Sequence, residues 1–268
     1  MPLFVFISGF FSRRENLKLS TIIKPLVVFQ LINVIIISIL RSNFSVSYFL
    51  IPHWTLWYLL SLVFWRIILK CTPDKLINTP YVYLGITFVA ALLIGLFLPY
   101  GRILSIQRTI SFLPFFLLGY YFRNNSIKQV LWGKFLSIFL LLTICLFNIL
   151  GCYPSNASIL LRGADPYNLS DLPAKIFLLL CTLVCVYSLW NLKCEIRSLA
   201  KIGEKSLLYY LYHGLIIQFL LVPLTQRLNL PTDMCCILIY LSTILFIIYQ
   251  MSRISLFRWL VNPNFNCK

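Results

Sequence analysis

The sequence predicts an all-α fold, a polytopic transmembrane helical bundle with about eight complete spans and a partial span at the N-terminus. Three observations lead to this prediction. The chain has 268 residues, of which 60% are hydrophobic and 11% are charged, and its mean hydropathy is +0.88. A protein of this composition cannot bury its apolar surface in one soluble core, so lipid must act as part of its solvent. Apolar runs near the ~20 residues needed to cross a bilayer recur along the chain, and basic residues gather in alternate loops.

The predicted spans are apolar runs bounded by charged residues, prolines or glycines. In chain order they are Ile22–Leu40, Trp54–Leu69, Tyr81–Pro99, Thr109–Phe122, Leu131–Gly151, Pro173–Trp190, Ser206–Val222 and Met234–Gln250. Thr109–Phe122 is the shortest, and Pro114 and Gly119 can bend its helix. Ahead of these spans, the opening residues MPLFVFISGFF resemble the end of a further membrane helix whose beginning is missing.

The distribution of basic residues predicts the orientation. Most of the 23 Lys and Arg residues fall into loops on one side of the predicted membrane. The other side receives only Arg41, Arg102, Arg108, Arg162, Lys175 and Arg227. Because cytoplasmic loops are enriched in Lys and Arg, we expect a multi-pass cell-membrane protein with a cytoplasmic C-terminus. The net charge of +16 is then a topology signal, and no nucleic acid is expected as a partner.

The rest of the chain gives no sign of a second domain or of a metal centre. No linker, low-complexity segment or internal repeat divides it, so we expect residues 1–268 to form a single membrane domain. The longest loop, from Cys152 to about Leu172, is expected to face outward. Cysteines such as Cys145 and Cys181 lie inside apolar runs, where they are expected to be small core residues. Without a CxxC pair or a histidine cluster, we predict no metal.

Two of the ionisable residues inside predicted spans stand out, because a charge costs about 2.5–3.5 kcal/mol at the bilayer centre and usually faces a polar cavity. His213, in SLLYYLYHG, is expected about two turns into its helix. It is a candidate substrate-binding residue, and the alternative is a core histidine that hydrogen-bonds to a neighbouring helix. Arg66, in LVFWRIILK, is a second candidate, although a side chain so near a helix end can also snorkel to the interface.

Two further candidates lie at the outward ends of predicted spans. Arg108 precedes TISFLPFFLLGYYF, and a guanidinium group suits phosphate or carboxylate because it forms bidentate hydrogen bonds. An interfacial anchor is an equally good interpretation of Arg108. His53 follows Pro52 and precedes Trp54, at a position where aromatic residues commonly form an interfacial belt.

Four segments of the chain, in the same order, resemble the acyltransferase 3 family of membrane acyltransferases, in its fucose 4-O-acetylase-like branch. The first is MPLFVFISGFF, which is similar to the end of the second helix of that family. The second, HWTLWYLL followed by FWR, contains His53 and Arg66. The third, RTISFLPFFLLGYY, contains Arg108, and the fourth, IGEKSLLYYLYH, ends at His213.

The resemblance implies transfer of an acyl group, by default acetyl from acetyl-CoA, to a hydroxyl of a cell-surface carbohydrate or a lipid-linked glycan. It implies about ten helices, which eight complete spans, a partial second helix and a missing first helix would supply. The family's proposed catalytic histidine lies on that first helix, so it is expected upstream of Met1. The resemblance therefore implies an N-terminally truncated and inactive chain, in which Arg66, Arg108, His213 and His53 are candidates for binding substrate.

Two other classes of membrane protein share this composition. A transporter or flippase would use intramembrane ionisable residues to line a substrate path, and paired repeats or matching broken helices would be expected. A glycan polymerase would be expected to have larger outer loops or more spans. The sequence contains none of these features.

Overall fold

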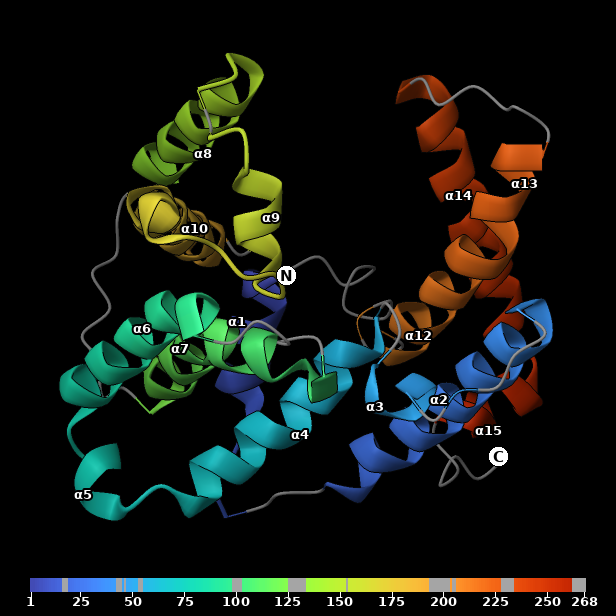
Figure 1. Cartoon of the computed structure of the whole chain (residues 1–268), viewed down its shortest axis with the longest axis horizontal. Coiled ribbons are helices and arrows are strands. Elements are labelled where there is room, and N and C mark those ends of the chain that lie inside the picture. Colours follow the sequence, from blue (N-terminus) through green and yellow to red (C-terminus); the bar gives the residue numbers. More distant parts are fainter. Residues whose placement is uncertain are drawn as a thin grey trace. The chain divides into compact units, whose positions relative to one another are not determined.

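A computed structural model of the chain describes residues 1–15, 19–41, 45, 47–52, 55–97, 103–124, 134–152, 154–192, 203, 206–227 and 234–261. Every regular element in these ranges is a helix, as the all-α prediction requires. Contacts between residues divide the chain into two compact units (Figure 1). Unit 1 comprises Met1–Leu17 and Leu60–Cys194, and unit 2 comprises Lys18–Leu59 and Glu195–Lys268. The expectation of a single domain stays a prediction.

Unit 1 contains most of the helices in the first two-thirds of the chain. They are α1 (Pro2–Phe11), α4 (Leu56–Cys71, from Leu60 onward), α5 (Asp74–Ile77), α6 (Pro80–Phe97), η1 (Ile103–Ser105), α7 (Ile106–Arg123), α8 (Lys134–Ile149), α9 (Ala157–Arg162), η2 (Leu169–Asp171) and α10 (Leu172–Asn191). Unit 2 contains α2 (Ser20–Arg41), α3 (Ser47–Leu50), α12 (Ser206–Ile216), the π-helical turn η3 (Ile217–Leu221), α13 (Val222–Arg227), α14 (Met234–Met251) and α15 (Ser255–Val261).

Each of the eight predicted spans contains a helix at the expected place: α2, α4, α6, α7, α8, α10, the α12–α13 run and α14. Among the described residues, five helical segments are long and apolar enough to cross a membrane, which are Ser20–Leu40, Pro80–Phe97, Ile103–Arg123, Leu169–Asn191 and Ser206–Thr225. At 1.5 Å per residue, the 16 residues of α4 or of α8 reach about 24 Å, less than the ~30 Å hydrocarbon core. The structure thus supports a membrane protein, and the count of eight spans is not confirmed.

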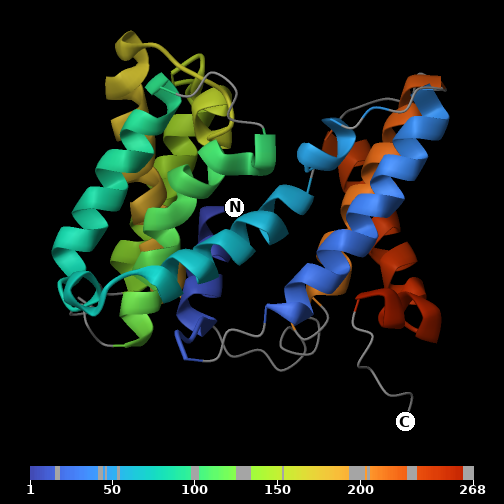
Figure 2. The same cartoon turned by 60° about the horizontal axis from the view of Figure 1, so that its bottom comes forward.

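Helix α7 lies at the centre of unit 1, packed against α1 and α6 (Figure 2). Of its membrane-length segment 67% is buried, against 22–33% for the other four segments. The predicted span Thr109–Phe122 is therefore part of a longer helix, which begins at Ile106 and ends at Arg123. Three consecutive apolar residues of this helix, Phe115, Phe116 and Leu117, are each at most 1% exposed.

Glycine lets α1 and α7 approach each other backbone to backbone. A Cβ atom on Gly9 would overlap the main-chain oxygen of Phe116, and a Cβ on Gly119 would overlap that of Phe6. Small residues at a crossing allow this close approach, which favours dispersion contacts where lipid removes the hydrophobic driving force between helices. The MPLFVFISGFF and FLPFFLLGYY motifs are thus joined in three dimensions.

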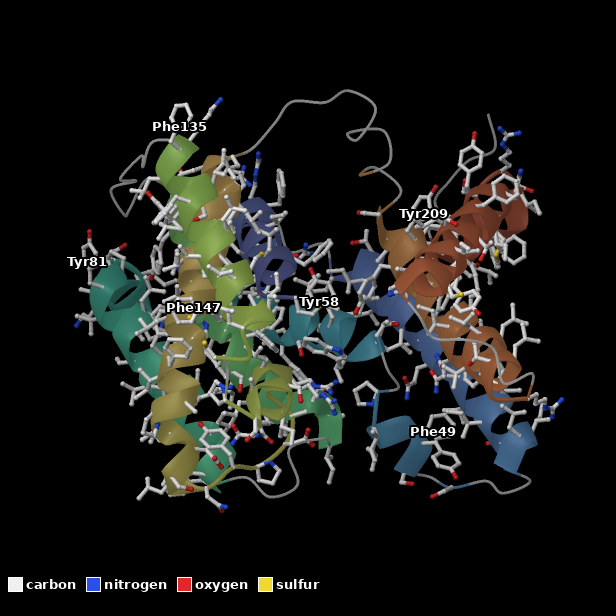
Figure 3. All side chains as sticks on the ribbon, turned by 90° about the horizontal axis from the view of Figure 1, so that it is seen from above. Phe49, Tyr58, Tyr81, Phe135, Phe147 and Tyr209 are labelled. Carbon is white, nitrogen blue, oxygen red and sulfur yellow. The ribbon has the colours of Figure 1, made fainter. Side chains whose placement is uncertain are left out.

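The surface of unit 1 carries many large apolar side chains. Tyr81 on α6 is 69% exposed, and Phe135 and Phe147 on α8 are 90% and 49% exposed (Figure 3). A soluble protein rarely shows so much contiguous apolar surface, whereas lipid solvates it. The exposure of these rings agrees with a membrane location.

In unit 2, Tyr212 on α12 is the centre of an aromatic core. Its ring lies 5.2 Å from that of Phe29 on α2 and 5.5 Å from that of Phe257 on α15, both edge to face. Such offset aromatic pairs stabilise packing by about 0.5–1.5 kcal/mol beyond area burial. Tyr212 is 5% exposed, and its hydroxyl donates to the oxygen of Phe257 at 3.3 Å. These contacts fix the rotation of α12 and thereby the place of the adjacent His213.

Candidate functional site

His213 is half-buried on α12, as expected for a residue two turns into its helix. Its Nδ1 lies 2.9 Å from the main-chain oxygen of Tyr209. A carbonyl oxygen only accepts hydrogen bonds, so this bond requires the proton of the neutral imidazole to be on Nδ1. The lone pair of Nε2 is then available to accept a hydrogen bond from a hydroxyl group, which is the property required of a residue that binds a hydroxyl substrate.

Thr55, which lies just before α4, contacts two residues next to His213 in space or sequence, Tyr210 and Gly214. The Tyr210 hydroxyl donates to the main-chain oxygen of Thr55, and the Tyr210 ring lies 5.6 Å from the His213 ring. Tyr58 also packs against Tyr210, and the centroids of their rings lie 5.3 Å apart. Gly214 permits this packing, since a Cβ there would lie 2.6 Å from Oγ1 of Thr55. Thr55 and Tyr58 of the HWTLWYLL motif therefore meet the SLLYYLYH motif within unit 2.

One helical turn after His213 the backbone widens into the π-helical turn η3. Pro223 follows this turn and lacks the N–H that would donate to the oxygen of Phe219, which loosens the regular ladder there. Short π-helical segments inside α-helices are frequent at functional sites. This π-helical turn is a second reason to consider His213 a candidate site residue. The sequence pattern did not predict the turn.

Arg66 and Arg108 are both half-buried in unit 1, and each lies next to a residue of one α4–α7 contact. The Trp65 indole nitrogen donates to the main-chain oxygen of Thr109 at 2.7 Å, and Oγ of Ser61 lies 2.8 Å from Oγ1 of Thr109. The Trp65 ring also stacks on Phe116, with centroids 5.6 Å apart. The FWR and RTISFLPFF motifs thus share a buried polar contact, with Arg66 and Arg108 at its edges.

The backbone that leads to Arg108 is strained. Leu104 and Ser105 have φ values of 49° and 53°, in the left-handed region that favours glycine. This conformation costs roughly 1–2 kcal/mol for each L-residue. Such strain persists where the surrounding structure demands a particular path, and it commonly accompanies functional sites. His53, the fourth candidate, lies outside the described residues.

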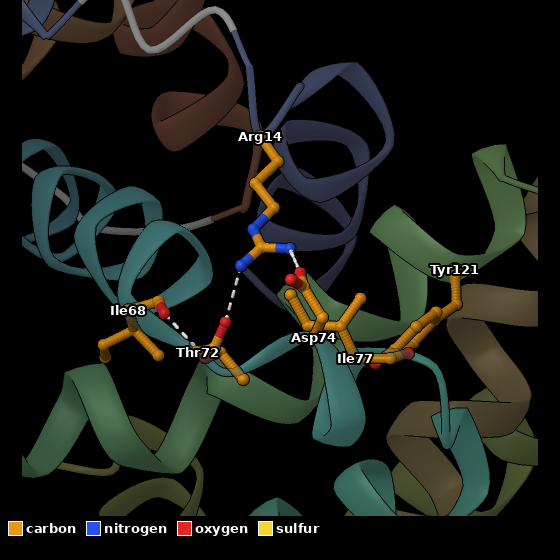
Figure 4. A network of polar contacts seen from close by, with 6 residues as sticks. All are labelled: Arg14, Ile68, Thr72, Asp74, Ile77 and Tyr121. Carbon is orange, nitrogen blue, oxygen red and sulfur yellow. Dashed lines mark hydrogen bonds and ion pairs between the residues drawn. The ribbon is translucent and has the colours of Figure 1, made fainter.

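The basic end of unit 1 is organised by Arg14 (Figure 4). Its guanidinium group forms an ion pair with Asp74 and donates to the main-chain oxygen of Thr72 at 2.7 Å. The hydrogen bond that Arg14 donates to the Asp74 carboxylate raises the pKa of Arg14 above its ordinary value. Nearby, the Tyr121 hydroxyl donates to the oxygen of Ile77 at 3.0 Å. These contacts place the ends of α4 and α7, both predicted to be cytoplasmic, at the same end of the unit.

Lys175 was missed as a candidate by the sequence analysis, which counted it among the outward charges. It is 5% exposed, and its Nζ donates to the main-chain oxygen of Leu160 at 2.6 Å. A buried lysine is unusual unless a partner compensates its desolvation. Its position one turn into a predicted span was the signal that could have identified it.

Comparison with known proteins gives no relative: no family model, no curated protein and no solved structure matches the chain. The motifs and the geometry of these residues are therefore the basis for a functional proposal.

Proposed function

We propose that this chain belongs to an integral membrane O-acyltransferase that acylates a hydroxyl of a cell-surface carbohydrate or lipid-linked glycan. In this reaction the hydroxyl oxygen attacks the thioester carbonyl of the donor, proposed to be acetyl-CoA. The new C–O bond forms, the C–S bond breaks, and the hydroxyl proton passes through a general base to the departing thiolate. The products are an acetyl ester and free CoA.

The observation that supports this proposal best is the contact between Nδ1 of His213 and the main-chain oxygen of Tyr209. With Nδ1–H bound to the oxygen of Tyr209 at 2.9 Å, Nε2 can accept a hydrogen bond from the acceptor hydroxyl and orient it for attack. We assign His213 this positioning role. By resemblance, the general base is a further histidine, the family's proposed catalytic one, and such a group contributes about 10²–10⁴-fold to rate.

Arg66 and Arg108 are proposed to bind anionic groups of the substrates. A guanidinium group binds phosphate or carboxylate in a bidentate manner, and CoA and lipid-linked glycans both carry phosphate. The buried contact between Trp65 and Thr109 supports this role, since it fixes the backbone beside both arginines. His53 remains a weaker candidate for binding substrate.

The test is acetyl transfer in membranes. Membranes that contain this chain, or the longest in-frame extension of it, receive acetyl-CoA labelled in the acetyl group, and labelled glycan is measured after extraction. We expect base-labile label in the glycan with the extended protein. Absence of label in glycan, combined with uptake of an unmodified sugar or lipid-linked sugar into vesicles, would instead establish the transporter or flippase alternative. Chain lengthening of the glycan would establish the polymerase.

A further inference from the structure

A cavity of about 410 Å³ lies at the end of unit 1 that is predicted to face outward. Its lining includes Gly95 on α6, Asn156 before α9, and Tyr167, Asn168 and Asp171 in the connection to α10. Its volume falls within the ~300–1,000 Å³ of typical small-ligand sites. The cavity belongs to the long outer loop, in which the sequence analysis found no candidate.

Tyr167 forms a fixed wall of this cavity. Its backbone N–H donates to the oxygen of Gly95 at 3.2 Å, and its hydroxyl donates to the oxygen of Leu92. The ring lies directly on Gly95, where a Cβ atom would overlap it. Burial raises the pKa of the Tyr167 hydroxyl, so the ring stays neutral. An aromatic face held this way is preformed for contact with the apolar face of a ligand.

Asp171 is the acidic group of the cavity, and its carboxylate is oriented by two donors. Asn156 Nδ2 donates to Oδ1 at 2.6 Å, and the Asn168 N–H donates to Oδ2 at 3.2 Å. Each carboxylate oxygen can accept a further hydrogen bond, and the Asn156 amide has a second N–H that can donate and an oxygen that can accept. The lining thus offers both acceptors and donors to groups that, like sugar hydroxyls, both accept and donate.

Lys175 supports the cavity wall. Its Nζ donates to the oxygen of Leu160, a lining residue, and lies 5.8 Å from the centroid of the Tyr167 ring. A cation over an aromatic face is attracted by the ring quadrupole, which contributes on the order of 1 kcal/mol. Lys175 therefore holds two walls of the cavity, and its ammonium group is directed to them.

These features favour a neutral ligand. The one formal charge among the lining residues is that of Asp171, and the ammonium group of Lys175 against the same walls offsets it, so the cavity selects neither an anion nor a cation by net charge. Hard cations need several oxygen ligands, and the described ranges hold no group of three or more His, Cys, Asp or Glu residues placed for a metal ion. We propose that the cavity binds a sugar ring of the glycan, with Tyr167 as an apolar wall beside the sugar and Asp171 and Asn156 bound to its hydroxyls. The choice of a glycan among neutral polyhydroxylated ligands rests on the proposed function.

The test is saturation-transfer NMR on the full chain in lipid nanodiscs, without any acyl donor. The probes are the methyl glycosides of glucose, galactose, mannose and N-acetylglucosamine, with glycerol as a small polyol for comparison. We expect saturation transfer to at least one glycoside and not to glycerol. Gly95→Ala displaces the Tyr167 ring and is expected to weaken that binding by about tenfold or more, the size of effect expected when a buried hydrogen-bonding site is disturbed.

Gly85→Ala is the matched control, since Gly85 lies on the same helix and a Cβ there would meet nothing within 4 Å. Thermal unfolding of both variants establishes that they are folded. Asp171→Asn, which keeps the shape of the side chain, provides a second variant that is expected to weaken binding if Gly95→Ala does not fold. The proposal is overturned if no glycoside receives saturation, if glycerol competes as well as the glycosides, or if both variants bind as the wild type does.

The failure of this proposal is distinguishable from that of the proposed function. Glycoside binding that Gly95→Ala removes, in a protein that transfers no acetyl group, would support the cavity and overturn the transferase. Acetyl transfer with no glycoside bound at this cavity would do the reverse.

Discussion

The indole nitrogen of Trp65 donates a hydrogen bond to the main-chain oxygen of Thr109 at 2.7 Å, and it joins α4 to α7 across 44 positions of the sequence. Trp65 is fully buried. Replacing it by phenylalanine removes the donor and leaves a small void, so we expect Trp65→Phe to lower the free energy of unfolding by about 1–3 kcal/mol. Thermal stability in detergent, followed by the loss of monodisperse protein in size-exclusion chromatography, measures this. Trp259→Phe, at a position that is 54% exposed, should change little.

The crossing of α1 and α7 predicts a strong effect of a single methyl group. A Cβ on Gly119 would overlap the main-chain oxygen of Phe6, and a helix backbone cannot move aside as a flexible side chain can. We expect Gly119→Ala to destabilise the protein by about 1–3 kcal/mol, the cost of overpacking a tight interior. The same thermal assay applies, with Gly85→Ala as control. Equal stability of the two variants would show that α1 and α7 do not cross at these glycines.

His213 is expected to affect transfer and not folding. In the form of the protein that acetylates glycan, His213→Ala should lower the rate by about 10²-fold or more because the acceptor hydroxyl loses its hydrogen-bond acceptor. His213→Gln, whose longer side chain can place an amide oxygen near the position of Nε2, should restore part of the rate. A purely structural histidine would give no such partial rescue, and both variants would then differ from the wild type mainly in thermal stability.

Gly214 provides an independent check on the surroundings of His213. A Cβ at this position would lie 2.6 Å from Oγ1 and 2.8 Å from Cγ2 of Thr55, a buried side chain. Gly214→Ala should therefore displace α12 and lower acetyl transfer by about tenfold, as small misplacements of reacting groups commonly do. Gly203→Ala, where a Cβ would meet nothing within 4 Å, serves as control.

The predicted orientation can be tested with two native thiols. Cys71, at the end of α4, and Cys152, in the long loop, are both exposed. In variants that keep only Cys71 or only Cys152 of the nine cysteines, a membrane-impermeant maleimide should label Cys152 in intact cells. Cys71 should react only after the membrane is permeabilised, since it lies at the end that the basic residues predict to be cytoplasmic. Labelling in the opposite pattern would show that the predicted topology is reversed.

The local features of this protein follow from its sequence. All eight predicted spans contain helices because the length of an apolar run and the residues at its ends are properties of contiguous segments. The apolar interior of α7, FLPFFLL, could also be recognised as a helix, although its predicted start at Thr109 lay three residues inside the observed start at Ile106. The apolar run begins only after the polar residues Gln107 and Arg108, so the prediction placed the start of the helix too late.

Only the tertiary structure decided which helices are central and which distant residues meet. Helix α7 has the lowest hydropathy of the five membrane-length segments and yet is the most buried, because hydropathy measures transfer into lipid and not packing against protein. Its polar groups find protein partners instead, as Gln107 does by donating to the oxygen of Asp165 at 2.8 Å. The packing of the Tyr167 ring against Gly95 could not be predicted either, since no local pattern of charge or hydropathy encodes a contact between residues so far apart in the chain.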